Sequence, residues 1–163
     1  MANIRHALII GAPAEKVYHA ITTQAGLRSW WTPDTTTEAD NIFRFPFGPT
    51  YFKEMKVTTL KQYEEVTWTC IAGADEWIGT TLSFKLDEGD QQTISNAHPE
   101  ILGQLQQNNN SLVTLLRFQH DGWKKETPMH AECNYTWGQF LRSLKLYCET
   151  DRGTPWPNQH SSK

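Results

Sequence analysis

Histidine, cysteine and carboxylate side chains occur at several places in this chain where they could do chemistry. His120 shares strand parity with Leu116 and Phe118, so its imidazole is predicted to point toward the inner face of a sheet. There it could act as a general acid, a pH-sensitive group or a polar contact for a ligand. A hydrogen-bonded core histidine is the alternative, because the sequence places no serine, cysteine or carboxylate as an evident partner.

Metal and acid–base sites have weaker support. His130 and Cys133 lie three residues apart and could join His120 around a zinc ion, but no second motif supplies the remaining ligands. The acidic pairs at residues 64–65 and 75–76 fall at predicted turns, where a solvated surface is the expected environment. Phosphate loops, nucleophile elbows and dinucleotide fingerprints are absent from the sequence. We therefore predict no catalytic residue, no metal and no cofactor.

Aromatic side chains are concentrated on positions that are predicted to face inward. Stiff rings between a curved sheet and a helix can enclose a pocket, and apolar walls with one or two polar groups are typical of small-molecule sites. Solid packing of the same rings is the alternative; of the neighbouring Trp30 and Trp31, we expect one in the core and one at an opening, unless both are packed. We predict that the ligand is lined by Trp30, Phe45, Met55, Trp68, Phe84, Phe118, His120, Trp137 and Leu141.

A long amphipathic helix over residues 128–149 is the main element that would position these side chains. Thr127 can cap its start, and Pro128 is tolerated in the first turn because that N–H has no helical partner. Gly153 and Pro155 are expected to close it. One apolar stripe follows the three-to-four-residue period and contains Cys133, Trp137, Phe140, Leu141, Leu144 and Cys148.

The remaining elements indicate an antiparallel sheet. A strand over residues 4–10 is followed by a helix from Pro13 and a second short helix capped by Thr23. Alternation of period two then marks strands near residues 42–47, 55–59, 66–70, 78–86 and 112–120. The polar segment 91–110 interrupts this pattern, and we expect it to be an insertion with a short helix at 99–106. Ile101, Leu102 and Leu105 would lie on one side of that helix.

Composition bounds the remaining functions. With 163 residues, a net charge of −3 and no basic stripe, the chain is predicted to be a single domain over residues 1–155 that does not bind nucleic acid. Residues 156–163 are expected to be a loose tail. No apolar run is long enough to span a membrane. Three cysteines without a framework pattern favour reduced thiols and a cytoplasmic location.

Several segments together resemble a known superfamily. They are TTQAGLRSWWT (22–32), EWIGTTLSF (76–84), FQHDGW (118–123) and CNYTWGQFLRSLKLYCET (133–150). They resemble the START-like and birch-pollen-allergen-like superfamily, and within it the bacterial branch named after the activator of heat-shock-protein-90 ATPase. The resemblance implies an α+β helix-grip fold, in which a curved antiparallel sheet wraps around a long C-terminal helix, with two short helices after the first strand. It covers nearly the whole chain except residues 91–110 and supplies no catalytic motif.

Superfamily members include lipid and hormone carriers, aromatase/cyclases and ring-hydroxylase subunits. The resemblance therefore implies a protein that binds a small hydrophobic or aromatic molecule between sheet and helix. One alternative is a cyclase- or hydratase-type enzyme that uses His120. Another is a chaperone helper or protein-interaction module, with an apolar patch at Ile101, Leu102 and Leu105. A homodimer is left open, and a chaperone contact has little support, because the eukaryotic activator carries its chaperone-binding domain separately.

Overall fold

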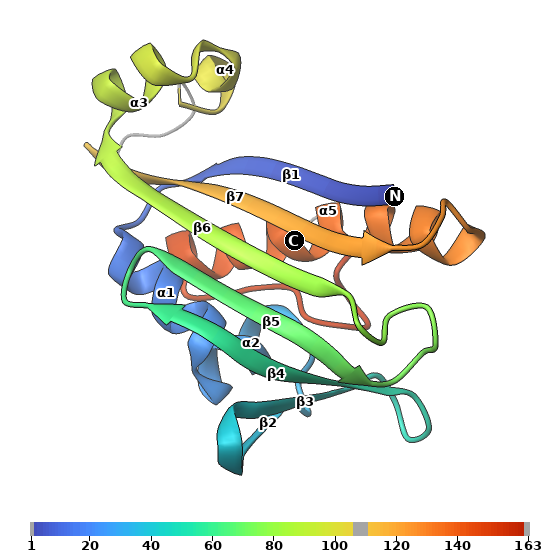
Figure 1. The fold of residues 1–163 in the computed structure, drawn as a ribbon. Coiled ribbons are helices and arrows are strands. Elements are labelled where there is room, and N and C mark those ends of the chain that lie inside the picture. Colours follow the sequence, from blue (N-terminus) through green and yellow to red (C-terminus); the bar gives the residue numbers. More distant parts are fainter. Residues whose placement is uncertain (1, 106–110, 162–163) are drawn as a thin grey trace.

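A single seven-stranded antiparallel sheet forms the centre of the molecule (Figure 1). The computed structural model describes residues 2–105 and 111–161. The strand order is β1-β7-β6-β5-β4-β3-β2, so the first strand lies beside the last and the others follow as a meander. The strands are β1 (Ala2–Ile10), β2 (Thr36–Glu38), β3 (Ile42–Pro46), β4 (Phe52–Lys61), β5 (Glu65–Ala72), β6 (Thr81–Asp90) and β7 (Leu112–Trp123). The predicted α+β class and antiparallel sheet are confirmed.

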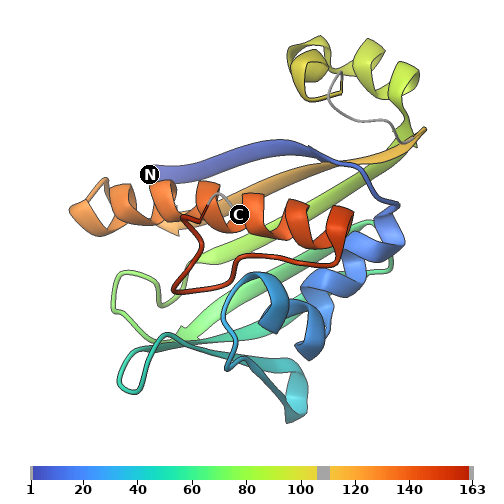
Figure 2. The same cartoon turned by 180° about the vertical axis from the view of Figure 1, so that it is seen from behind.

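Three helices cover one face of this sheet (Figure 2). They are α1 (Ala14–Thr22), α2 (Gln24–Trp30) and the long α5 (Pro128–Thr150). Thr23 caps α2 as predicted, since its side chain accepts a hydrogen bond from the Gly26 N–H. The stripe predicted for the last helix is buried against the sheet, and His130 and Ser143 are buried with it. This is the helix-grip arrangement expected from the sequence.

The bounds of α5 agree with the predicted 128–149 to within one residue, but the residue that closes the helix was predicted wrongly. Thr127 Oγ1 accepts a hydrogen bond from the His130 N–H at 3.2 Å, which is the expected N-cap. The helix ends earlier than Gly153, because Asp151 adopts the left-handed conformation at φ 63°. Gly153 has a different role, since a Cβ there would lie 2.4 Å from the Ser29 carbonyl oxygen. The glycine therefore lets the chain pass close against α2 as it turns back.

The chain after α5 folds back and packs against Trp31, at the end of α2, and against Phe47, just after β3. The Trp156 N–H donates to the Trp31 carbonyl at 2.7 Å, and the Trp156 ring lies 5.9 Å from Phe47. Ser143 Oγ holds the preceding stretch, because it accepts from the Thr154 N–H at 2.8 Å. Part of the segment that we expected to be a loose tail is thus packed on the domain, while residues 162–163 lie outside the described part.

The insertion forms a small helical unit at the far end of β6 and β7, where it projects away from the rest of the molecule (Figure 1). It contains α3 (Gln91–Ala97), which the sequence analysis missed, a 3₁₀ turn (Pro99–Ile101) and α4 (Leu102–Leu105). The prediction that Ile101, Leu102 and Leu105 share one side of a helix was wrong in one respect. Ile101 and Leu105 are buried, but Leu102 is 48% exposed. A second core lies beneath this unit and is made by Ile9, Ile94, Ile101, Leu105, Val113 and Leu115.

One strand boundary was also wrong. The strand predicted over residues 78–86 was expected to begin at Ile78, but this residue lies in the turn before β6 and is 49% exposed. Its neighbour Trp77 is the buried residue of that turn, at 2% exposure. Among the helices that the structure describes, none is long and apolar enough to cross a membrane.

Candidate functional site

The nine residues predicted to line a ligand cavity are all in the interior, and each is at most 2% exposed. Their rings contact one another: the centroids of Trp68 and Phe84 are 5.0 Å apart, and those of Phe118 and Trp137 are 4.5 Å apart. They line none of the pockets described below. The structure therefore places all nine side chains in the packed interior, where the aromatic rings among them contact one another.

The two neighbouring tryptophans are both packed. Trp30 is 0% exposed and Trp31 is 1% exposed, so neither stands at an opening. The indole N–H of Trp30 donates to the Ala20 carbonyl at 2.7 Å. The Trp31 ring lies 4.2 Å from Phe45 and 5.0 Å from Trp137. Trp31 thus joins the helical layer to the sheet at the centre of the core.

His120 is fully buried, and both of its ring nitrogens are occupied by hydrogen bonds. The Trp137 indole N–H can only donate, so His120 Nδ1, at 3.2 Å, must accept and is unprotonated. The proton is then on Nε2, which donates to Thr80 Oγ1 at 2.9 Å, and Thr80 donates onward to the Trp77 carbonyl at 2.6 Å. Burial, helped by the nearby charge of Lys53, lowers the pKa of His120 to about 3. Among the described residues the hydrogen-bond partners of this imidazole are Thr80 and Trp137, which is the arrangement of a core histidine.

The sheet carries a lysine at an inward-facing position. Lys53 on β4 has the same parity as Met55 and Val57, and it is only 7% exposed. Its Nζ lies over three ring faces, at 3.9 Å from the centroid of Trp77, 4.5 Å from Phe47 and 5.0 Å from Tyr51. Burial lowers the pKa of Lys53 to about 8. A cation surrounded by aromatic rings therefore lies where the strand pattern calls for an apolar side chain.

Lys53 lines the floor of an open groove between α5, the β3–β4 turn and the C-terminal segment. The groove has a volume of about 460 Å³, which is within the range of small-molecule sites. The turn and the helix provide its walls, and Trp156 from the C-terminal segment closes one side. We call it the Lys53 groove; it is lined by Phe47, Tyr51, Lys53, Met129, Glu132, Cys133, Thr136, Phe140, Trp156 and Gln159.

The thiols near Lys53 do not provide a negative charge. Cys133 in the groove and Cys70 on β5 are both buried, and burial raises the pKa of each thiol. Cys133 Sγ accepts a hydrogen bond from the Trp77 indole N–H at 3.3 Å. Both sulfurs are therefore neutral at physiological pH and act as small core groups.

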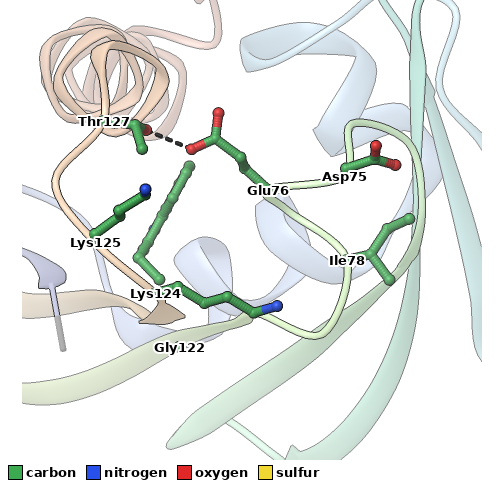
Figure 3. A pocket seen from close by; sticks show the side chains of 8 residues that line it. Asp75, Glu76, Ile78, Gly122, Lys124, Lys125 and Thr127 are labelled. Atoms are coloured by element: carbon green, nitrogen blue, oxygen red, sulfur yellow. Dashed lines mark hydrogen bonds between the residues drawn. The ribbon is translucent and has the colours of Figure 1, made fainter.

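A second, smaller pocket lies beside the start of α5 (Figure 3). Glu76 accepts a hydrogen bond from Thr127 Oγ1 at 2.5 Å, and Lys124 and Lys125 extend along the rim (Figure 3). Its volume of about 220 Å³ is below the usual range for a ligand site. The carboxylate is already engaged at the helix start and both lysines are exposed, so this pocket is a weaker candidate than the Lys53 groove.

Comparison with known proteins identifies the family. A family model described as "Activator of Hsp90 ATPase homolog 1-like protein" matches residues 11–149. The chain belongs to this AHSA1 family. The solution structure of an Aha1 dimer from Colwellia psychrerythraea is similar to this chain, with 32% sequence identity and a TM-score of 0.72. The match covers 94% of this chain and 100% of the Colwellia chain. The family resemblance and the helix-grip fold predicted from the sequence are thereby confirmed.

More distant structures share only the fold of this AHSA1 domain. A protein from Mesorhizobium loti is 14% identical over 88% of this chain and 94% of that chain, with a TM-score of 0.64. A protein from Bacillus halodurans is 18% identical over 91% of this chain and 98% of that chain, with a TM-score of 0.62. No curated protein matches the AHSA1 chain.

The sequence analysis missed Lys53, which lines the groove of this AHSA1 domain, and Trp77, whose ring packs against the Lys53 ammonium. The signal for Lys53 was present, because extending the alternation of Met55 and Val57 back by two residues places it on the inner face. Trp77 had no such signal, since it lies in a turn without strand period. His120, which the sequence analysis considered as a zinc ligand, is hydrogen-bonded to Thr80 and Trp137. Within the described residues, no three His, Cys, Asp or Glu side chains come together to hold a metal.

Proposed function

We propose that this AHSA1 domain binds a small, largely apolar or aromatic molecule in the Lys53 groove. The observation that carries the proposal is an open hollow of about 460 Å³ with Phe47, Met129, Phe140 and Trp156 on its walls and the buried Lys53 side chain on its floor. Apolar walls with few, well-placed polar groups are the usual composition of small-molecule sites.

The nine residues first predicted to line the ligand have a supporting role in this proposal. Phe45 pairs directly across the sheet from Lys53, and Trp137 lies one helical turn before Phe140. Their close packing fixes the strand and helix that carry the groove walls, and a rigid support keeps a binding site preorganised. The ligand is thus still held between sheet and α5, but at the open end of their interface.

Methionine methyl NMR tests where a ligand binds. Met129 lines the groove and Met55 is 0% exposed in the packed interior, so the two methyl signals report on the two locations separately. With 2-naphthamide as a neutral aromatic probe, the Met129 signal should shift on titration while the Met55 signal stays in place. A shift of Met55 alone would place the ligand among the nine interior residues, and no shift of either with any aromatic, sterol or fatty probe would contradict the proposal.

A pair of substitutions on α5 provides the matched control. Thr136 and Gln139 are both half-buried on the same helix, but only Thr136 lines the groove. Thr136→Trp should fill the groove and abolish the Met129 shift, whereas Gln139→Trp should leave it unchanged. If both variants bind the probe equally, the ligand lies elsewhere.

Self-association is proposed on separate grounds. The relative from Colwellia psychrerythraea is described as a dimer, and its whole length aligns with this chain at 32% identity. We infer that this chain also forms a homodimer, and the molar mass in solution from light scattering would test it; a monomer at high micromolar concentration would contradict it. The family description also refers to activation of the Hsp90 ATPase. A chaperone contact is the rival function, which a pull-down with purified Hsp90 would reveal.

A further inference from the structure

Lys53 is the only buried cation in the part of the chain that the structure describes. The remaining lysine and arginine side chains there are half-buried or exposed, and several form ion pairs, such as Lys145 with Glu149 at 2.9 Å. Lys53 has no carboxylate within ion-pair distance among the described residues. Burying an ammonium without a counterion is unfavourable, because three aromatic rings replace only part of its hydration.

No group that faces Lys53 supplies the missing negative charge. Tyr51 precedes β4, Cys70 lies on β5, Cys133 on α5 and His120 on β7; the thiols are protonated and the imidazole is neutral, for the reasons given above. Burial raises the pKa of the Tyr51 hydroxyl, which keeps it neutral as well.

Glu132 is the remaining acidic group of the groove. It is exposed on the rim and forms no ion pair with Lys53 within the described residues. The floor of the groove is therefore positive, and Phe47, Met129, Phe140 and Trp156 supply the apolar part of its walls.

The geometry leaves the ammonium accessible from one direction. The Phe47, Tyr51 and Trp77 rings surround it. The backbone of Gly73 lies against the base of the same side chain, since a Cβ at Gly73 would lie 3.3 Å from Lys53 Cγ. The open side is the groove that Lys53 itself lines. An anion that enters there would replace the missing hydration with a charge-assisted hydrogen bond.

We propose that the natural ligand of the Lys53 groove is an aromatic or aliphatic acid, whose anionic group binds the Lys53 ammonium while its apolar body lies between Phe47, Phe140 and Trp156. This inference rests on the proposed function, because it names the class of molecule that the same groove takes. Lys53 is then the specificity-determining residue of the site. The burial of its charge follows from this role, since a solvated lysine would attract any anion but would not select one with an apolar body.

The test compares two ligands of the same shape. The acid 2-naphthoate and the neutral amide 2-naphthamide differ mainly in charge, and both are titrated against the Met129 methyl signal. A charge-assisted hydrogen bond predicts that wild-type protein binds naphthoate at least about tenfold more tightly than naphthamide. Lys53→Met and Lys53→Gln should lose this preference and keep their affinity for naphthamide. Lys56→Met, on the exposed face of the same strand, should keep the preference.

A second measurement does not depend on the variants folding. The ¹³Cε signal of Lys53 should titrate at higher pH with naphthoate than with naphthamide, because a bound anion favours the charged ammonium. Equal affinities for the two compounds in wild type, or a preference that survives in both Lys53 variants, would overturn the inference while the groove function stands. If neither compound shifts Met129, the groove function itself fails and the inference falls with it.

Discussion

Replacing Lys53 by methionine should stabilise the protein at neutral pH. The ammonium is 7% exposed and its pKa is lowered from 10.5 to about 8, so the folded state holds the charge at a cost that the unfolded chain does not have. A difference of roughly 2.5 pKa units corresponds to about 3 kcal/mol at pH 7. Methionine fills a similar volume without the charge. Lys53→Met is therefore expected to raise the free energy of unfolding by up to that amount, less whatever the three ring contacts contribute.

The stability difference between wild type and Lys53→Met should depend on pH. Between pH 8 and 10.5 the unfolded chain binds more protons at this lysine than the folded protein does, so the stability of wild type rises with pH relative to the variant. The advantage of Lys53→Met should shrink by about 2 kcal/mol between pH 7 and pH 9.5. Burial raises the pKa of Tyr51, Cys70 and Cys133, but these groups are common to both proteins, so their contributions largely cancel in the difference.

Urea unfolding followed by circular dichroism at the two pH values provides the measurement. Lys56→Met is the matched control, because Lys56 is exposed on the other face of β4 and its loss should change stability by only a few tenths of a kcal/mol at either pH. The reasoning is refuted if Lys53→Met destabilises the protein at pH 7, or if its effect is the same at both pH values.

Four further outcomes follow from single contacts. Thr80→Val should destabilise by about 1–3 kcal/mol, because it leaves the His120 Nε2–H buried without an acceptor; Thr58→Val, at an exposed strand position, serves as the control in the same urea titration. His120 should show no imidazole titration by NMR between pH 8 and 5, and because its folded pKa lies below its unfolded value, the stability it supplies should fall as the pH drops below 6.5; an imidazole that titrates near pH 6 would contradict the hydrogen-bond assignment. Thr127→Ala should cost about 1 kcal/mol through loss of the α5 cap, measured by thermal unfolding. Gly153→Ala should displace the returning chain, seen as a lower melting temperature and a changed tryptophan emission, since its Cβ has no room; an unchanged protein would show that this close approach is not required.

Local sequence signals were sufficient to predict the main secondary-structure elements of this protein. Thr127 before Pro128 predicted where α5 begins, because a cap and a proline act on the first helical turn alone. The apolar stripe of α5 was likewise readable, since its period depends only on helix geometry. The insertion was harder: its polar composition indicated an interruption, but the core that buries α3 includes Ile9, Val113 and Leu115, which lie outside the insertion.

The candidate site illustrates the same division. Strand parity correctly placed the six of the nine residues that lie on strands on the inner face, and the same parity reaches Lys53 two positions before Met55. Parity gives a direction but no distance. Whether rings that point inward leave a cavity or touch depends on the separation of sheet and helix, which is fixed by all side chains of the core together.

Sequence alone therefore determined the class of fold, the family and the buried face of α5 and of most strands. Tertiary structure alone decided that the interior is packed and that the Lys53 groove lies at the end of the sheet, where Trp156 returns from a segment more than a hundred residues away from Phe47 and Lys53. The physical reason is range: caps and periodicity act over a few residues, whereas a pocket is the space left between elements that only the folded chain brings together.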